Sequence, residues 1–259
     1  MQMKISLITV CFRSAGTLRT ALDSVLEQKG VDLDYIVADG GSDDGTVELL
    51  KEYEAKFAGR MRWISEKDRG MYDAINKGIK MATGDVVGIL NADDMLESPD
   101  TLAHVAECFD CEDHIDALYA DIRFVKGDLN TTCRYYSAKH WKPWMFQWGK
   151  MPPHPSVYIR RELFEKFGLY KLGYDIAADY ELLIRYLRVA RIKSRYLNES
   201  IVRMRMGGKS TRGWRSNLKL NQEIVRGNRE NGYFCCLPML FPKYLFKIFE
   251  FILPRLGIR

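Results

Sequence analysis

The sequence lacks any uncharged apolar run as long as the roughly 18 residues that a membrane-spanning helix requires. It also lacks an internal repeat and a low-complexity tract. The first residues have the pattern of a strand, and Arg13 follows them, so we expect no secretory signal peptide. These absences favour a cytoplasmic protein, and a chain of 259 residues with 47% hydrophobic residues can bury a sizeable core.

Cysteine occurs without a pattern typical of disulfides or of a metal site. Cys108 and Cys111 form a lone CxxC pair, and no second pair accompanies them. A structural zinc site needs about four ligands, so this pair alone does not predict one. We expect the six cysteines to be reduced thiols, which agrees with a cytoplasmic location.

Positive charge is concentrated in one stretch of the chain. The formal net charge is +5, and residues 185–229 contain 13 Lys or Arg against two Glu. Such a block favours anionic partners such as phosphates or acidic lipids, although it is also typical of solvated helix and strand faces. It carries no nucleic-acid recognition motif and lies far along the chain from the acidic turns described below. We therefore expect no nucleic acid partner.

Strand and helix patterns alternate in the first part of the chain. Apolar residues recur at helical spacing in some segments, and short apolar runs typical of strands separate them. Alternation of this kind implies crossover connections and a mostly parallel sheet. The predicted strands are 5–12, 35–38, 61–65 and 86–90, and the predicted helices are 18–28, 47–57 and 71–81.

The second part of the chain predicts an antiparallel extension of this sheet, because 117–125 and 133–137 alternate like strands. The fold class is therefore α/β, with a mostly parallel central sheet and flanking helices. The remaining predicted elements are a strand at 195–206 and helices at 162–167, 178–189 and 214–230.

Two of the predicted strands end in acidic turns. The strand at 35–38 leads to Asp39 and a Gly-rich turn, and the strand at 86–90 leads to Asp93 and Asp94. Open α/β sheets bind ligands at the carboxyl ends of their strands. Oxygen ligands on such turns suit a hard divalent cation that also holds a diphosphate. The alternatives are an ordinary turn after Asp39 and a helix cap at Asp94.

Several motifs, in order along the chain, resemble family 2 glycosyltransferases of the GT-A type. The resemblance is strong over residues 4–96 and weaker beyond them. It is carried by ISLITVCF at 5–12, TLRTALDSVLEQ at 17–28, the Asp39 turn, SEKDRGMYDAINKGI at 65–79, NADD at 91–94, HPS at 154–156, ADYE at 178–181 and GGKS at 207–210.

For the donor, this resemblance implies a UDP- or GDP-sugar with its base against Asp39. A carboxylate at a strand end can accept a hydrogen bond from the imino N–H of uracil or guanine. Thr9, close to the end of the first strand, is expected to line the same cleft. Either Arg69 or Lys77 offers positive charge to the phosphates, and the sequence leaves that choice open.

For the cofactor, the resemblance makes Asp94 the direct ligand of Mn²⁺ or Mg²⁺ and places Asp93 against the ribose or donor sugar. A cation bridging two phosphate oxygens neutralises the charge that develops as the nucleoside diphosphate departs. Asn91 stands where the family often has Asp. That departure removes one negative charge and leaves the acidic pair intact.

For the reaction itself, Asp179 aligns with the family's general base, and Asp175 is the reserve candidate. Ala178 replaces the usual Glu, which removes a negative charge that would raise the pKa of Asp179. A first-turn Asp also suits the helix dipole, which is the structural alternative. His154 is either a contact to the diphosphate or metal, or a structural residue. The segment 207–210 is either a loop closing over phosphates or a simple turn.

Two apolar features remain outside these motifs. Residues 140–149 contain three Trp and one Phe, which suit either the apolar face of a sugar or packing on the protein's own helices. Residues 231–259 form an amphipathic C-terminal tail in which Pro residues argue against a spanning helix. Within it, 243–253 predicts a short helix for an anionic membrane surface. Alternatively, its apolar face packs against the protein's own core or against a second copy of the chain in a homodimer.

We therefore expect a GT-A glycosyltransferase domain at 1–230, with a nucleotide-sugar half at 1–96 and an acceptor half at 97–230. The predicted activity is inverting, metal-dependent transfer to a saccharide or lipid-linked saccharide. The expected setting is surface polysaccharide biosynthesis at the inner face of a bacterial cytoplasmic membrane. The alternatives are a sugar-nucleotide pyrophosphorylase, for which 13–16 is a poor phosphate loop, and a non-catalytic carbohydrate-binding scaffold. Four retained carboxylates argue against the scaffold: Asp39, Asp93, Asp94 and Asp179.

Overall fold

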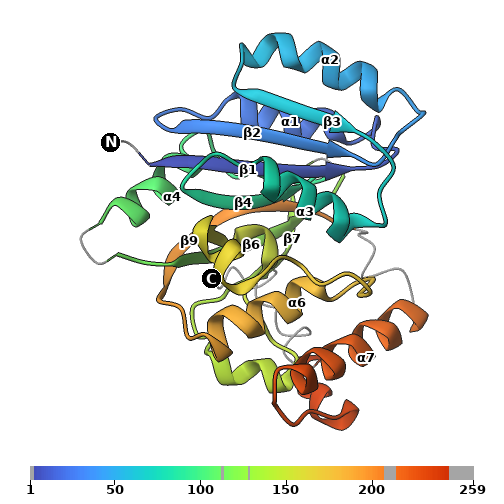
Figure 1. The fold of residues 1–259 in the computed structure, drawn as a ribbon, viewed down its shortest axis with the longest axis vertical. Helices are drawn as coiled ribbons and strands as arrows, with labels where there is room; N and C mark the ends of the chain where they lie inside the picture. Colours follow the sequence, from blue (N-terminus) through green and yellow to red (C-terminus); the bar gives the residue numbers. More distant parts are fainter. Residues whose placement is uncertain (1–2, 112–113, 128, 207–213, 245–259) are drawn as a thin grey trace.

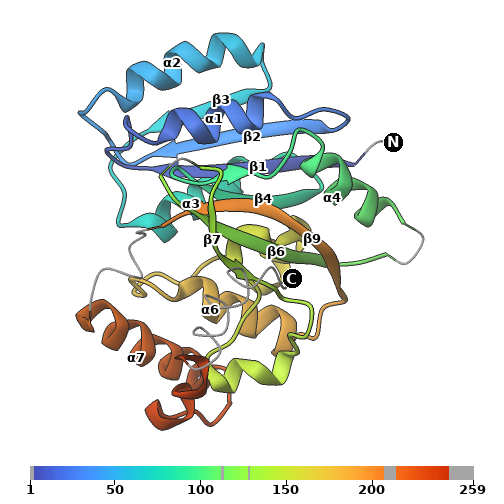
Figure 2. The same ribbon diagram turned by 180° about the vertical axis from the view of Figure 1, so that it is seen from behind.

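A nine-stranded sheet runs through the molecule in the computed structural model, which describes residues 3–111, 114–127, 129–206 and 214–244. The strand order is β3-β2-β1-β4-β8-β6-β9-β5, and β7 pairs with β6 beside this path. Helix α3 covers one face of the first strands in Figure 1, and α1 and α2 cover the other face, which Figure 2 shows from behind. The predicted α/β class is confirmed.

The first half alternates strand and helix as the sequence predicted, and β1 to β4 are mutually parallel. The register aligns their carboxyl ends, because Cys11 lies opposite Asp39, Asp39 opposite Ser65, and Val10 opposite Asn91. The acidic turns therefore meet at one edge of the sheet. The elements are β1 (Lys4–Cys11), α1 (Leu18–Leu26), β2 (Asp32–Asp39), α2 (Thr46–Phe57), β3 (Met61–Ser65), α3 (Met71–Met81) and β4 (Val86–Asn91).

The sheet separates two hydrophobic cores because its central strands are buried on both faces. On β1, Ile5 and Leu7 face the core that contains α1 and α2, whereas Ile8 and Val10 face the core that contains α3. This alternation with a period of two decides which side of the sheet each polar residue meets.

The second half adds the antiparallel extension that the sequence predicted. Strand β6 (Ala117–Val125) pairs antiparallel with β7 (Thr132–Tyr136) and β8 (Tyr158–Arg160), and parallel with β9 (Ser194–Arg205). The predicted helix 178–189 is helical, but it changes from α to π at Ile184. The other elements are β5 (Met95–Leu96), α4 (Thr101–Asp110), η1 (Pro143–Trp148), η2 (His154–Ser156), α5 (Glu162–Phe167), α6 (Ala178–Leu183), η3 (Ile184–Val189), α7 (Trp214–Glu230) and η5 (Leu237–Leu240).

Within the part of the chain that the structure describes, no helix is long and apolar enough to cross a membrane. Strands from both predicted halves join one sheet, and the boundary between 96 and 97 stays a prediction. The predicted loop at 207–210 and most of the predicted helix at 243–253 lie outside the described residues.

Candidate functional site

The turn after β2 encloses the carboxylate of Asp39, which is almost fully buried. Its Oδ2 accepts hydrogen bonds from the N–H groups of Gly41 (3.1 Å) and Ser42 (2.9 Å) and from the hydroxyl of Ser65 (2.6 Å). Its Oδ1 accepts one from the Ser42 hydroxyl (2.5 Å). Burial would raise the pKa of Asp39, but the bonds from Ser42 and Ser65 outweigh it and lower the pKa. The side chain is therefore an ionised acceptor at neutral pH.

Phe12 and Asp68 lie beside this turn, and the sequence reasoning had not singled out either residue. A Cβ atom at Gly40 would come within 3.2 Å of both the Phe12 ring and the Asp68 carboxylate, so both side chains border Gly40. The Phe12 ring is 58% exposed, although it follows a fully buried strand. The available signal was its position, because a large aromatic one residue beyond β1 must stand at the carboxyl edge of the sheet.

The two cations left open by the sequence have different surroundings. The Lys77 ammonium lies 2.5 Å from Asp68 Oδ1 and 2.9 Å from Glu66 Oε1. Arg69 is largely exposed and pairs with Asp73 on the first turn of α3. Lys77 is therefore linked to the Asp39 turn through Asp68, which borders Gly40, whereas the ion pair of Arg69 is with α3.

Thr9 lies elsewhere than the cleft that the sequence suggested. Its side chain is fully buried, and its Oγ1 accepts a hydrogen bond from the Tyr35 hydroxyl at 3.0 Å. Both residues belong to the side of the sheet covered by α1 and α2. The alternation along β1 places Thr9 in the interior, two residues before the strand end at Cys11. We therefore leave Thr9 out of the donor site proposed below.

The turn after β4 holds its two carboxylates in different environments. Asp94 is buried, and its oxygens accept hydrogen bonds from the Asn91 side-chain amide (2.8 Å) and the Arg205 N–H (3.1 Å). Burial, reinforced by the charge of Asp93, raises the pKa of Asp94 to about 8. No hydrogen bond from the described residues reaches the side-chain carboxylate of Asp93. Its backbone carbonyl oxygen lies 3.5 Å from the Arg205 guanidinium. Asp94 thus ties the turn to β9, and Asp93 is the more available oxygen donor.

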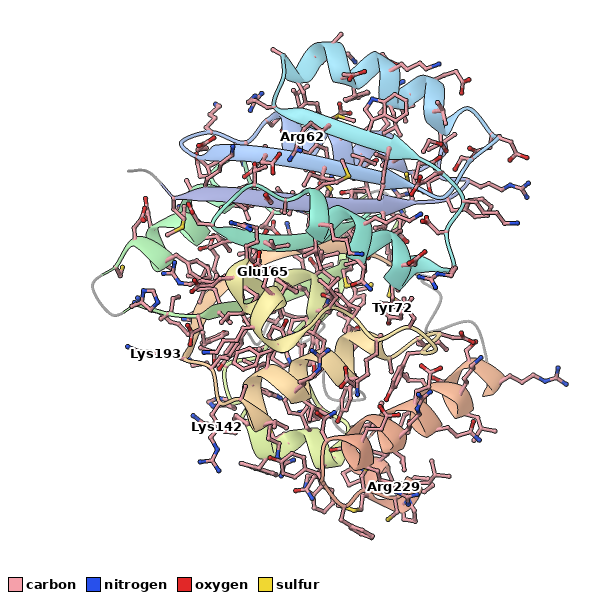
Figure 3. The ribbon with its side chains drawn as sticks, viewed as in Figure 1. Arg62, Tyr72, Lys142, Glu165, Lys193 and Arg229 are labelled. Carbon is pink, nitrogen blue, oxygen red and sulfur yellow. The ribbon has the colours of Figure 1, made fainter. Side chains whose placement is uncertain are left out.

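Asp179 lies in the first turn of α6, and α3 reaches it across the sheet edge. The hydroxyl of Tyr72, which is labelled in Figure 3, donates to the carbonyl oxygen of Ile176 (2.6 Å) and lies 3.3 Å from Asp179 Oδ1. The N–H of Tyr180 donates to the same oxygen at 2.8 Å. Burial raises the pKa of Asp179, against the opposing charge of His154 and these hydrogen bonds.

His154 belongs to the same cluster through Tyr170. Its Nε2 lies 2.7 Å from the Tyr170 hydroxyl, and the Tyr170 ring stacks on Tyr72 with ring centres 5.8 Å apart. Asn76 of α3 holds the Tyr170 backbone through its amide, with bonds of 2.9 and 3.0 Å. Burial lowers the pKa of His154, so the neutral imidazole is favoured despite the charge of Asp179. Residues of the segments 65–79 and 154–156 therefore both contribute to the cluster of side chains around Asp179.

A buried carboxylate from α7 caps the segment that leads to Asp179. The Glu223 side chain accepts hydrogen bonds from three successive N–H groups, those of Asp175 (2.9 Å), Ile176 (2.9 Å) and Ala177 (2.8 Å). These donors precede α6 and would otherwise lack partners within the helix. Nothing in the sequence signals this contact, because α6, η3 and β9 lie between Ala177 and Glu223 along the chain.

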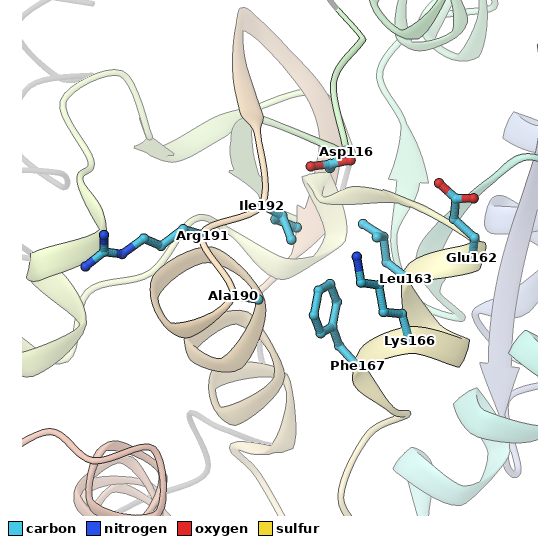
Figure 4. Close-up of a pocket in the computed structure, with 8 residues that line it drawn as sticks. All are labelled: Asp116, Glu162, Leu163, Lys166, Phe167, Ala190, Arg191 and Ile192. Atoms are coloured by element: carbon cyan, nitrogen blue, oxygen red, sulfur yellow. The ribbon is translucent and has the colours of Figure 1, made fainter.

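Two of the cavities on the surface of the described residues lie near elements of the second half of the chain. One, of about 260 Å³, lies beside the Asp179 segment and is lined by Asp175, Ile176, Arg215, Ser216 and Lys219. The other, of about 340 Å³, contains none of the predicted site residues and lies between α5 and the end of η3 (Figure 4). The backbone oxygen of its lining residue Asp116 accepts a hydrogen bond from the N–H of Arg160, which pairs with the first residue of β4. This cavity therefore lies toward the opposite edge of the sheet from the acidic turns. The strand-end carboxylates, and not this cavity, define the candidate site.

Comparison with known proteins matches the chain to described glycosyltransferases. The family model for glycosyl transferase family 2 matches residues 6–167. A PGL/p-HBAD biosynthesis glycosyltransferase of Mycobacterium bovis (strain BCG / Pasteur 1173P2) is 31% identical over 193 residues, covering 74% of this chain and 73% of its own. An uncharacterized glycosyltransferase of Nostoc sp., alr2836, is 27% identical and covers 80% of this chain and 66% of its own.

Solved structures share the fold at low sequence identity. S. aureus TarS 1-349 in complex with UDP-GlcNAc has a TM-score of 0.65 at 17% identity, covering 96% of this chain and 73% of that one. The mannosyltransferase PcManGT from Pyrobaculum calidifontis, in complex with GDP-Man and Mn²⁺, has a TM-score of 0.67 at 18% identity, covering 89% and 64%. This chain spans 39% of another TarS chain.

The resemblance noted in the sequence is thus confirmed, as is its fold. The chain belongs to glycosyl transferase family 2, whose model matches more than half of its length, and it has the α/β fold of the GT-A transferases.

Proposed function

We propose that this protein transfers a sugar, with inversion, from a UDP- or GDP-sugar to an acceptor hydroxyl, using Asp179 as the general base. The observation that carries the proposal is the chain of contacts along one sheet edge. Ser65 at the end of β3 donates to Asp39, and Tyr72 in the following helix contacts Asp179. A donor-binding carboxylate and a base candidate are therefore linked by a single motif of the sequence.

The nucleobase is proposed to bind between Phe12 and Asp39. An exposed aromatic ring gives the base a face to stack on, and the ionised Asp39 accepts from its imino N–H. Both oxygens of Asp39 now accept from serine hydroxyls, and each hydroxyl can rotate to make room for a ligand donor. The UDP-GlcNAc and GDP-Man of the solved neighbours support a donor of either class.

The turn after β4 is proposed to hold Mn²⁺ or Mg²⁺ with the donor diphosphate. No cluster of three or more His, Cys, Asp or Glu ligands occurs among the described residues. That donor set still fits, because such cations commonly take one or two protein carboxylates and complete their shell with phosphates and water. The contacts favour Asp93 as the ligand and Asp94 as the residue that fixes the turn, which revises the assignment made from the sequence. The bound cation would neutralise charge on the departing diphosphate.

In the proposed step, the Asp179 carboxylate takes the proton of the acceptor hydroxyl. The hydroxyl oxygen forms a bond to the anomeric carbon while the bond from that carbon to the β-phosphate oxygen breaks, and the nucleoside diphosphate leaves with the electron pair. One displacement converts an α-linked donor into a β-linked product. The raised pKa of Asp179 suits this role, because a stronger base accepts the proton more readily.

The acceptor is proposed to be a saccharide or lipid-linked saccharide, and the setting the cytoplasmic side of a bacterial membrane during surface glycan biosynthesis. The mycobacterial relative is named for PGL/p-HBAD biosynthesis, which supports a glycoconjugate acceptor. The cavity beside Ile176 and Lys219 adjoins the Asp179 segment and gives the acceptor a place to approach the base.

The proposal can be tested by screening nucleotide sugars for binding and then measuring transfer in variants of the candidate general base. We expect one UDP- or GDP-sugar to raise the melting temperature with Mn²⁺, and that donor to support transfer with inverted anomeric configuration. Asp179→Asn should abolish most transfer, whereas Asp175→Asn, at an exposed residue that pairs with Lys219 and lines the acceptor cavity, should retain turnover at saturating acceptor. Retained configuration, or pyrophosphate release from a nucleoside triphosphate, would contradict the proposal. Loss of transfer only in the Asp175 variant would move the base there.

A further inference from the structure

Exposed large apolar side chains gather at one end of the molecule. Of the eleven such side chains among the described residues, six lie in η1, at the end of η3, and in 234–241. Their exposed fractions are 54% for Trp144, 40% for Trp148, 49% for Val189, 70% for Phe234, 44% for Leu237 and 69% for Phe241. In Figure 1 the η1 segment and the last described residues form the end of the molecule opposite α2. We call this surface the aromatic end.

Contacts between distant segments hold the aromatic end together. The Gln147 side-chain amide donates to the Phe234 backbone carbonyl oxygen at 2.9 Å, and the Arg188 guanidinium donates to the side-chain oxygen Oε1 of Gln147 at 2.7 Å. The same guanidinium lies over the Tyr233 ring, 3.7 Å from its centre. Phe146 of η1 points inward and is fully buried. The exposed rings therefore stand on a packed base.

The aromatic end is also free of acidic residues along the chain. The segments 137–150, 184–195 and 231–244 contain no Asp or Glu. In the adjoining helices, Glu181 and Glu230 both pair with Lys171, and Glu223 accepts hydrogen bonds from backbone N–H groups. The cations of the three segments are Lys139, Lys142, Lys150, Arg185, Arg188, Arg191, Lys193, Arg195 and Lys243.

We propose that the aromatic end lies against the surface of an anionic lipid bilayer. Trp and Phe side chains partition into the interface between headgroups and acyl chains, and Lys and Arg around them are attracted to acidic lipids. The proposal rests on the proposed function only in that a lipid-linked acceptor would meet the enzyme there. A second copy of the chain is a less favourable partner than the bilayer, because a symmetric contact would bring two basic surfaces together and they would repel.

Vesicle flotation of the full chain tests this surface directly. The wild-type protein should float with phosphatidylcholine vesicles containing phosphatidylglycerol, and less with phosphatidylcholine alone or at high salt. The variant Trp144→Ser/Phe234→Ser/Phe241→Ser should bind at least about tenfold more weakly, because its three exposed rings supply the apolar contact. Leu172→Ser, at a 41% exposed site outside the aromatic end, is the matched control and should bind like the wild type.

A charge variant tests the proposal independently, in case the triple variant fails to fold. Lys142→Glu changes one exposed side chain of the aromatic end and should weaken binding to anionic vesicles selectively. Donor-induced thermal shifts, measured on every variant, separate this proposal from the transfer reaction, since they should be unchanged.

Two outcomes would overturn the proposal. One is unaltered vesicle binding in both the triple and the charge variant, which would move the membrane contact to 245–259. The other is a wild-type protein that ignores vesicles and forms a dimer that the triple variant loses in sedimentation equilibrium. That dimer would assign the aromatic end to a second copy.

Discussion

Substituting Glu223 by Gln nearly preserves the shape of the side chain. It removes the negative charge that binds the three N–H groups just before α6, the helix that carries Asp179. The carboxylate receives one N–H on Oε1, from Asp175, and two on Oε2, from Ile176 and Ala177. The amide oxygen of Gln can keep the pair of bonds from Ile176 and Ala177. Its NH₂ group then faces the N–H of Asp175, where two donors meet and no bond forms.

The magnitude follows from these three bonds. A hydrogen bond to a charged group contributes about 1.5–3 kcal/mol, and a neutral one about 0.5–1.5 kcal/mol. Two bonds become neutral, at a cost of about 1–1.5 kcal/mol each, and one charged bond is lost. Asp175 is exposed, so water can replace most of that lost bond. We expect the free energy of unfolding to fall by about 2–3 kcal/mol. Because Asp179 follows this segment directly, we also expect transfer to slow by about 10–100-fold, with donor affinity preserved.

Urea denaturation, single-turnover transfer and donor calorimetry measure the three quantities. Glu230→Gln is the matched control on the same helix, since Glu230 accepts from the side chains of Lys171, Tyr174 and Arg226. It should cost less than about 1 kcal/mol and leave transfer nearly unchanged. A loss of stability in Glu223→Gln without any slowing of transfer would refute the link between the cap and the base. A parallel fall in donor affinity would show a general disturbance of the fold.

The remaining predictions concern the carboxylates of the site. Asp179→Asn should slow single-turnover transfer by about 10²–10⁴-fold and leave donor binding intact in calorimetry. Because burial raises the pKa of Asp179, the base is lost by protonation as the pH falls through a value above the ordinary pKa of an Asp side chain. An acid limb of kcat/KM at or below about pH 4 would count against it. Asp39→Ala should weaken donor binding more than it lowers the rate at saturating donor, and the reverse pattern in steady-state kinetics would exclude a base-binding role.

The sequence predicted the first half of the fold closely because its periodic patterns coincide with local propensity. The predicted 61–65 and 71–81 agree with β3 and α3 to the residue. Short elements such as β5 and β8 were not predicted. Two or three residues cannot display a period, and these strands exist because the neighbouring β9, β6 and β4 supply their partners.

The site was predictable to the level of strand ends and no further. Parity along a strand decides where a side chain points, and Thr9 shows that closeness to a strand end is insufficient. The sequence does not distinguish the adjacent residues Asp93 and Asp94. Only the structure does, because the side chain of Asp94 accepts hydrogen bonds from Asn91 and Arg205. The Glu223 cap arises from packing between segments far apart in sequence, which no local pattern encodes.

Calorimetry of UDP and GDP, with and without Mn²⁺, tests the central claim that the strand-end carboxylates bind a metal-associated nucleotide donor. The account predicts that one nucleoside diphosphate binds the wild-type protein at least about tenfold more tightly with Mn²⁺. Asp93→Asn should remove that enhancement, and Asp39→Ala should weaken binding with and without the metal alike. Failure of both nucleotides to bind, or an enhancement that survives in Asp93→Asn and in Asp94→Asn, would contradict it.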